Sequence, residues 1–308
     1  MKVLSFPSPA IPDWQTALGY FLLFKRGEGV SIRTIEDYSK HISQFFSRSF
    51  CEIQDPNLEK AVLSYLSDQV APATYNLRLV YLRGFFRWCI DEHYLSCDPT
   101  RRLKRRKAPA RIVQLDLDTL KALLKLPDRT TYAGVRDYAL LLLSLDNGIR
   151  PGEALSLRVA DINLTGHQVN VRAENAKTRV PRTLPISQST VQAISDLIRS
   201  RHPGWAQDVP LFCSASGRHL GEEWSRRVTR YGKQIGVTLR AYDLRHTFAL
   251  HFLRGGADAF SLQCMLGHED MAMTKRYLAL GHQDLTRVHQ ASTPLQAIIP
   301  QTKRKRKI

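Results

Sequence analysis

Apolar residues recur at helical spacing through the first third of the chain. From Trp14 onward, large apolar side chains return every three or four positions, and glycines at 27 and 29 follow as helix-ending residues. Ser31 has the side chain preferred at an N-cap, so a second helix is expected to begin there. The four helices expected in this region cover about residues 14–27, 31–46, 58–67 and 73–92. Four helices before any strand signal predict a small all-helical bundle.

The pattern changes after residue 112 to helices interrupted by two short strands. Asp116 or Asp118 caps the first helix, and Asn147-Gly148 ends a strongly apolar one. Alternating residues predict strands at Gln168–Arg172 and Arg182–Ile186, which form a hairpin. The other expected helices cover about residues 190–201, 222–236, 244–253 and 259–266, and a last helix holds Tyr277. The chain is therefore expected to be mainly α with a small β-sheet, with an α+β domain after the helical bundle.

Proline positions and charge runs predict the domain boundaries. The first twelve residues contain three prolines and are expected to form an extended arm. Asp98-Pro99 ends the helical pattern, and a basic, flexible linker is expected to follow it. The predicted divisions are an arm (1–12), a helical domain (13–99), a linker (100–112), a larger domain (113–290) and a tail with a basic end (291–308).

The charge balance indicates a polyanionic partner. The 308 residues carry a formal net charge of +17, and the pI is about 9.9. Much of the excess lies in Arg101–Arg111, with seven basic residues and no acid, and in Lys303–Lys307, with five. Such a distribution favours nucleic acid over an anionic membrane. The five cysteines form no CxxC pair, and no apolar run reaches the ~20 residues of a membrane span, so we expect a cytoplasmic protein without a metal site.

Basic residues on the expected fourth helix and in the linker are candidates for DNA contacts. The fourth helix is predicted to carry apolar residues on one face and arginines on the other. A charged face is most often only a solvated surface, but here it adjoins the basic linker. Contacts from such residues to phosphates would position a duplex without reading its sequence. The candidates are Arg78, Arg83, Arg87, Arg101, Arg102, Lys104, Arg105, Arg106 and Lys107.

A series of polar residues in the second half of the chain predicts a phosphate site. Arg150 precedes Pro151 at a helix start, and Lys177 lies in the predicted hairpin. Each of these residues is more often a salt-bridge partner or a solvated side chain when it is considered alone. The prediction of a phosphate site depends on the order and spacing of all these residues together. The series is completed by Arg245, His268 and, nine residues later, Tyr277.

This order strongly resembles the catalytic domain of the tyrosine recombinase family, which includes phage integrases and Xer-like proteins. Arg150 in GIRPGE and Arg245 in YDLRHTFA match the two family arginines, and Lys177 matches the hairpin lysine. His268 in MLGHED matches the late histidine, and Tyr277 matches the nucleophile. The segment TIEDYSKHISQFF is similar to the core-binding domain of that family, so the resemblance covers most of the chain.

One position departs from the family pattern. Members usually have a histidine three residues before the second arginine, where this chain has Tyr242. A tyrosine hydroxyl can bond a phosphate oxygen, but with an ordinary pKa near ~10 it is a poor proton acceptor. Three alternatives stay open: His268 contributes the base, the base is weaker and the enzyme slower, or Tyr242 supplies only a hydrogen bond.

The chemistry of phosphoryl transfer assigns roles to these residues. Negative charge spreads over the phosphate oxygens in the transition state, and planar guanidiniums suit it, so Arg150 and Arg245 form the expected clamp. Tyr277 is the expected nucleophile, and Lys177 is the expected general acid for the leaving 5′ oxygen. No metal or cofactor is required for this reaction. The resemblance implies a 3′-phosphotyrosyl intermediate.

The resemblance implies a site-specific recombinase that acts on double-stranded DNA. It also implies a homotetramer on DNA that exchanges C-terminal tails, and accessory DNA-bending proteins are possible partners. Packing of the tail on its own domain stays open as the alternative to that exchange. Two other functions stay open: DNA relaxation of the type IB topoisomerase kind, and DNA binding by a chain that has lost catalysis. The DNA site, and the choice between integration, excision, resolution and transposition, cannot be read from the sequence.

Overall fold

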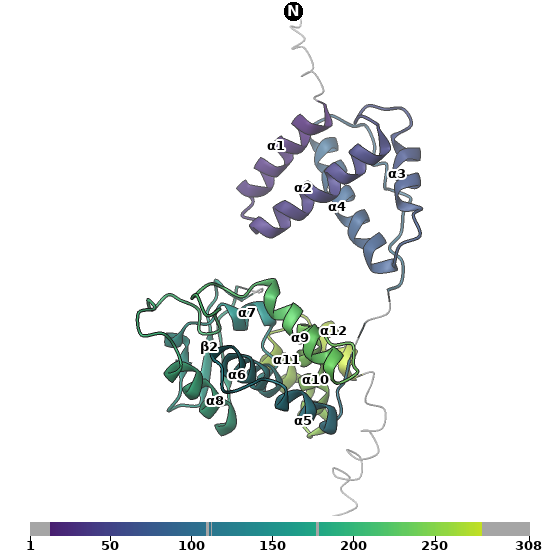
Figure 1. Cartoon of the computed structure of the whole chain (residues 1–308). Coiled ribbons are helices and arrows are strands. Elements are labelled where there is room, and N and C mark those ends of the chain that lie inside the picture. The colour runs from purple at the N-terminus through teal and green to yellow at the C-terminus, as the bar shows by residue number, and fades with distance from the viewer. Residues whose placement is uncertain (1–12, 109–110, 112, 177–178, 279–308) are drawn as a thin grey trace, which may run out of the picture. The chain divides into compact units, whose positions relative to one another are not determined.

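The computed structural model describes residues 13–108, 111, 113–176 and 179–278. Of residue 278 it describes the backbone only. The chain divides into two compact units, with the boundary between Ala110 and Arg111 (Figure 1). No helix in the described part is both long and apolar enough to cross a membrane.

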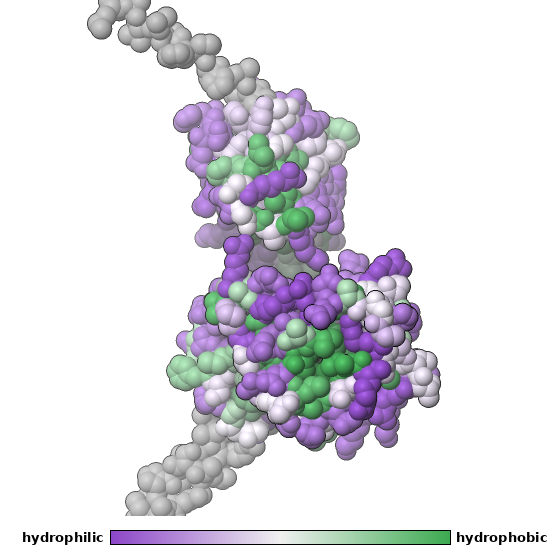
Figure 2. Space-filling view, turned by 90° about the vertical axis from the view of Figure 1, so that its left-hand side faces the viewer, coloured by the Kyte–Doolittle hydropathy of each residue, from purple (hydrophilic) through white to green (hydrophobic). Residues whose placement is uncertain are grey.

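The first unit is a bundle of four helices, as the apolar pattern predicts. They are α1 (Trp14–Gly27), α2 (Ile32–Ser49), α3 (Leu58–Leu66) and α4 (Pro72–Asp91). Asp13 caps α1, and Ser31 caps α2 by accepting a hydrogen bond from the Thr34 backbone amide. The core is rich in aromatic rings that meet mostly edge to face, which is a favoured geometry. The fully buried rings are those of Phe21, Phe45, Phe46, Phe85 and Phe86. On one side of this unit Figure 2 shows a group of hydrophobic residues at the surface.

Helix α4 buries a face that only partly matches the predicted one. Phe85, Trp88 and Cys89 are buried as expected. Leu77 was also expected in the core but is 45% exposed, whereas Arg78 was expected outside and is buried. The reason is that Tyr75, Leu79 and Leu82 define the buried face, and Arg78 lies among them at helical spacing. Arg78 therefore does not lie on the solvated face from which it was predicted to contact DNA.

Burial of Arg78 is compensated within the bundle. Its guanidinium donates to Asp68 at 2.9 Å and to the Tyr65 carbonyl at 3.2 Å. It also lies 4.6 Å from the centre of the Tyr65 ring. A buried charge is tolerated when it is paired and hydrogen-bonded in this way. Arg78 thus holds α3 and its following turn against α4.

The first part of the expected flexible linker is fixed to α4. Arg83 donates to the backbone carbonyls of Thr100 and Leu103, at 3.1 and 2.8 Å. Asn76 exchanges two hydrogen bonds with the backbone of Arg106, both 2.8 Å long. Thr100 is fully buried. The segment 100–106 is therefore packed against the helical unit rather than free as the predicted flexible linker, and the Arg83 guanidinium is bonded to the backbone of that segment.

The second unit contains eight α-helices and a small sheet among its described residues. The prediction of a mainly helical fold with a small sheet is confirmed, and Asp116 is the cap of α5. The helices are α5 (Leu117–Lys125), α6 (Tyr132–Asn147), α7 (Pro151–Leu155), α8 (Gln188–Arg199), α9 (Glu222–Gln234), α10 (Ala241–Arg254), α11 (Ala259–Leu266) and α12 (Met271–Leu278). The short 3-10 helix η1 (Val159–Asp161) leads into the sheet.

The sheet has three antiparallel strands in the order β1-β2-β3. They are β1 (Ile162–Asn163), β2 (Gln168–Val171) and β3 (Arg182–Pro185), and Val169 pairs with Leu184. The expected hairpin is confirmed, while the two-residue β1 was not predicted. Helix α6 forms the centre of the unit and packs against both α8 and α10 (Figure 1). Its buried leucines join the strands and α10 in one core.

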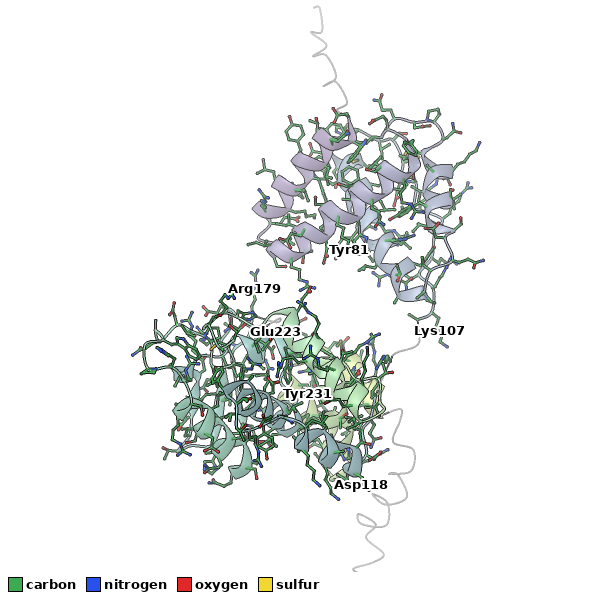
Figure 3. All side chains as sticks on the ribbon, in the orientation of Figure 1. Tyr81, Lys107, Asp118, Arg179, Glu223 and Tyr231 are labelled. Atoms are coloured by element: carbon green, nitrogen blue, oxygen red, sulfur yellow. The ribbon has the colours of Figure 1, made fainter. Side chains whose placement is uncertain are left out.

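A buried charge network connects α6 to α9. Asp137 is fully buried and accepts hydrogen bonds from Arg136 at 2.8 and 3.0 Å. On its other oxygen it accepts from Arg227 and, at 2.6 Å, from the hydroxyl of Tyr231, which Figure 3 labels on α9. The negative charge of this carboxylate compensates both arginines.

Asp137→Asn is expected to destabilise the second unit by about 3 kcal/mol, because it leaves two arginines without their buried counter-charge. Urea unfolding measures the loss. Asp196→Asn is the matched control: Asp196 pairs with Arg199 at the surface, and such pairs contribute about 1 kcal/mol or less. Equal stability of the two variants would contradict the structural role of Asp137.

Candidate active site

Two glycine turns form the backbone of the candidate site. Gly148 ends α6 and Gly267 ends α11, both in the left-handed conformation with φ of 64° and 60°. A Cβ on Gly148 would lie 2.3 Å from a ring atom of Phe248, so the turn also needs the small residue for space. The two turns present the carbonyls of Gly148, Leu266 and Gly267 to the arginines described next.

Arg150 lies at the N-cap of α7, as predicted. It donates to Glu153 at 2.9 Å and to the carbonyl of Gly267 at 2.9 Å. Arg182 of β3 donates to the other oxygen of Glu153 at 2.5 Å. Burial opposes the ionisation of Glu153, but the hydrogen bonds and charges of Arg182 and Arg150 prevail and lower its pKa. Glu153 therefore holds two guanidiniums in place as a carboxylate.

Arg245 of α10 is fully buried beside the same turns. It donates to the carbonyls of Gly148 and Leu266, each at 2.8 Å. Burial, with the nearby positive charge of Arg150, lowers its pKa to about 10, so it stays charged at neutral pH. Among the described residues no carboxylate pairs with it, and its buried Nε has no hydrogen-bond partner. The guanidinium is a buried cation without its own counter-ion.

His268 is held between Arg245 and α12. Its Nε2 lies 3.0 Å from an Arg245 nitrogen, and its Nδ1 lies 3.0 Å from the Thr274 hydroxyl. Since the guanidinium can only donate, Nε2 accepts and the ring is neutral. Burial first, and then the charges of Arg245 and Arg150, lower the pKa of His268 to about 4. A ring whose acceptor nitrogen is occupied, with so low a pKa, is poorly suited to be a general base.

Tyr277 lies on α12 with 5% of its surface exposed. Burial raises its pKa to about 12 despite the nearby charge of Arg245, so it is a protonated phenol in this state. Its hydroxyl lies 2.8 Å from Nδ1 of His246, the residue that follows Arg245 on α10. His246 was not among the residues predicted for the site. The available signal was its position one helical turn after Tyr242.

Tyr242 lies at the edge of the site and is 39% exposed. Its ring meets the His246 ring edge to face at 5.0 Å, and the Arg245 guanidinium carbon lies 5.8 Å from its centre. The hydroxyl of Tyr242 makes no hydrogen bond to any residue that the structure describes. Its exposure leaves that hydroxyl available to an incoming ligand.

Lys177 lies outside the described residues. The strands on either side of it are described, and Arg182 on β3 belongs to the site through Glu153. Neither Arg182 nor Glu153 was among the predicted site residues. The spacing of Glu153, three residues after an arginine at a helix start, could have indicated the pair.

The remaining DNA-contact candidates are exposed. Arg87 projects from α4, and Arg106 lies over the Tyr75 ring at 3.9 Å. Lys107 extends from the end of the helical unit in Figure 3. The other exposed candidates are Arg101, Arg102, Lys104 and Arg105. Their positions permit phosphate contacts, which stay a prediction.

The second unit therefore contains a cationic cup with a phenol beside it. Among the residues that the structure describes, the three guanidiniums of Arg150, Arg182 and Arg245 share one carboxylate, Glu153, which pairs with the first two. Such an excess of oriented donors suits an anion with several oxygens, such as a phosphate. His268 lies 3.0 Å from an Arg245 nitrogen, and its ring stacks with the Tyr277 ring at 6.4 Å between centres, so the phenol lies beside this cup.

The sequence matches the phage integrase family over residues 114–284. The tyrosine recombinase XerC of Thermodesulfovibrio yellowstonii is 28% identical over 288 residues, which cover 88% of this chain and 93% of that protein. The XerC of Escherichia coli O127:H6 is 30% identical over 72% of this chain and 74% of its own length.

Two solved structures show the same fold. A lambda integrase dimer bound to a COC′ core site gives a TM-score of 0.68 at 18% identity, covering 86% of this chain and 77% of that one. The Tn1549 transposon integrase in complex with circular intermediate DNA also gives 0.68, at 17% identity, covering 88% of this chain and 99% of that one. Because the family match spans more than half of the sequence, the chain belongs to the phage integrase family, the tyrosine recombinases.

Proposed function

We propose that this protein is a site-specific DNA recombinase that cleaves and rejoins strands through a 3′-phosphotyrosyl intermediate on Tyr277. The observation that carries the proposal is Arg245, a buried guanidinium without a carboxylate partner among the described residues. Burying an uncompensated charge is costly, so a protein that retains one has arranged a place for an external anion. The scissile phosphate is the anion that the family relationship supplies.

The described residues divide the reaction between them. Arg150, Arg182 and Arg245 neutralise the charge that develops on the phosphate oxygens, and Glu153 fixes the first two in position. Tyr277 attacks the phosphorus, and the 5′ oxygen of the broken strand leaves. A hydroxyl of another strand then attacks the phosphotyrosine and restores the backbone. Tyr242, exposed at the edge, can donate a hydrogen bond to a phosphate oxygen.

Double-stranded DNA is the proposed partner, bound by both units. Exposed basic residues from Arg101 to Lys107 and Arg87 of α4 provide phosphate contacts. A homotetramer on DNA, assembled through the C-terminal tail, is also proposed, with accessory DNA-bending proteins as further partners. Support for the assembly comes from the similar fold of a lambda integrase tetramer bound to a Holliday junction. The tail, residues 279–308, lies outside the described part.

A strand-exchange assay tests the proposed function. The binding site is first selected from a random duplex library, and two labelled duplexes of different length carrying it are then incubated with the protein. Strands of hybrid length are expected, without added nucleotide. Relaxation of a supercoiled plasmid with no hybrid strands would favour the topoisomerase alternative, which none of the relatives named above supports. Binding without cleavage would favour a protein that has lost catalysis.

Lys177→Ala is expected to slow cleavage by roughly 100-fold, as removal of a general acid does. A substrate with a sulfur at the scissile 5′ position should restore the rate, because thiolate leaves without a proton. Arg179→Ala is the matched control, because Arg179 lies close to Lys177 in the same connection between β2 and β3. This substitution should change the cleavage rate little, whichever of the two substrates is used. If sulfur fails to restore the Lys177→Ala rate, Lys177 is not the general acid.

A further inference from the structure

The attack by Tyr277 requires a proton acceptor that the sequence did not identify. The tyrosine hydroxyl is protonated in this structure, since its pKa is raised to about 12. A phenol must lose its proton as it bonds to phosphorus, and a positioned base accelerates that loss. The position where the family usually has a histidine holds Tyr242, a residue that is itself an acid of high ordinary pKa.

One base is in hydrogen-bond contact with the nucleophile. Nδ1 of His246 lies 2.8 Å from the Tyr277 hydroxyl oxygen, and the two rings are tilted by 48° with centres 5.7 Å apart. His246 lies four residues after Tyr242 on α10, so both side chains emerge on the same face of the helix. The contact joins residues 31 positions apart and depends on the packing of α12 against α10.

The other candidate bases in the described part are less suited to this step. His268 directs Nε2 at Arg245 and Nδ1 at Thr274, so both nitrogens are engaged. No hydrogen bond links the Tyr242 hydroxyl to Tyr277 in the described structure, although their rings both contact His246. His246 is therefore the histidine that the fold brings to the reacting atom.

We propose that His246 is the general base of strand cleavage and takes the place of the histidine that position 242 lacks. The proposal rests on the proposed function, because it assigns a proton path to the attack by Tyr277. The Tyr277 O–H bond breaks and its proton passes to Nδ1 of His246, while the oxygen bonds to phosphorus. The bond from phosphorus to the 5′ oxygen breaks at the same time, and that oxygen takes a proton from Lys177 or water. Rejoining reverses the path, with His246 returning the proton to Tyr277.

The charges around His246 keep its ring available for this role. Asp243 stabilises the protonated ring, whereas Arg245 and Arg111 oppose it, and the rings of Tyr242 and Tyr277 pack beside it. Burial contributes most, and the resulting pKa of His246 lies below its ordinary value. The ring is thus neutral at pH 7, so Tyr277 donates and Nδ1 accepts. Cleavage should be constant above the pKa of His246 and fall as pH drops through it.

His246→Asn separates proton transfer from hydrogen bonding. The asparagine amide oxygen can accept the tyrosine hydrogen bond near the position of Nδ1, but it cannot take up a proton at neutral pH. Single-turnover cleavage of a nicked suicide duplex, carrying the site selected from the random library, gives the rate of the full-length protein from pH 5 to 9. We expect a loss of roughly 100-fold at pH 7. We also expect a rate that rises about tenfold per pH unit, because the small phenolate fraction of Tyr277 then carries the reaction.

Two further variants complete the design. His251→Asn alters another histidine of α10, which lies outside the site and forms a 2.8 Å hydrogen bond with the Leu115 carbonyl. This variant should keep the wild-type pH profile. Tyr242→His in the His246→Asn background restores the family pattern. The double variant should cleave at least tenfold faster than His246→Asn alone.

The outcomes distinguish the base from a positioning role. A His246→Asn rate within about threefold of wild type, with an unchanged pH profile, would show that His246 only positions Tyr277 and would overturn the proposal. A slow variant with the wild-type pH profile would overturn it equally. If the wild-type protein forms no covalent complex, the proposed function itself fails, whereas a wild-type complex with an unaffected variant removes only the base.

Discussion

Tyr277→Phe is expected to abolish covalent protein–DNA complexes while DNA affinity stays unchanged. The substitution removes only the hydroxyl group. Among the described side chains, His246 is the one that forms a hydrogen bond with it. The ring also packs with Phe248 and the leucines of α11, contacts that phenylalanine preserves, so the fold should be retained. A denaturing gel after incubation with the suicide duplex measures the complex, and a gel shift measures binding.

Tyr138→Phe is the matched control for that substitution. Tyr138 is partly buried on α6, where its ring packs beside the Arg129 guanidinium at 4.7 Å, and it takes no part in the site. This variant should form covalent complexes at the wild-type rate. Complexes that persist in Tyr277→Phe but not in a different tyrosine variant would assign the nucleophile elsewhere.

Arg245→Lys is expected to reduce the cleavage rate by roughly 100- to 1000-fold with little effect on DNA affinity. Lysine keeps the positive charge but loses the planar fork that bonds Gly148 and Leu266 while facing the anion. The loss should lie in the transition state, because oriented donors act on charge that develops during the reaction. Single-turnover cleavage and equilibrium binding, measured on the same duplex, separate the two effects.

Arg172→Lys provides the comparison for Arg245. Arg172 lies at the end of β2 and pairs with Asp161 at 3.1 Å and Glu174 at 2.6 Å, so its charge is already compensated. That variant should cleave at close to the wild-type rate. An Arg245→Lys protein that is folded and equally active would show that the unpaired buried guanidinium has no role in catalysis.

Helix positions were predictable because they depend on local pattern. Capping residues such as Ser31 and Asp116 begin helices where the sequence places them, and left-handed glycines such as Gly148 end them. The face of α4 was not predictable, since Arg78 is buried only because Asp68 and Tyr65 compensate it. That compensation depends on tertiary packing, which periodicity does not contain.

In the site, too, some residues could be predicted from the sequence and others depended on tertiary packing. Arg150, Arg245, His268 and Tyr277 could be assigned from their order, and the structure brings the three cationic or imidazole side chains to the same two turns. The carboxylate that organises them, Glu153, was missed even though it lies three residues after Arg150, and its second partner could not be assigned because Arg182 is 29 residues away on a strand. His246 was passed over because a histidine on a helix has no distinctive signal until α12 brings Tyr277 against it.

Identifying the atom that bonds to DNA is the most direct test of Tyr277 as the nucleophile. The covalent complex formed on the suicide duplex is digested with trypsin and nuclease, and tandem mass spectrometry locates the nucleotide adduct. A single adduct is expected on Tyr277, joined through the 3′ phosphate of the cleaved strand. An adduct on Tyr242 or another residue, or attachment through a 5′ phosphate, would contradict it.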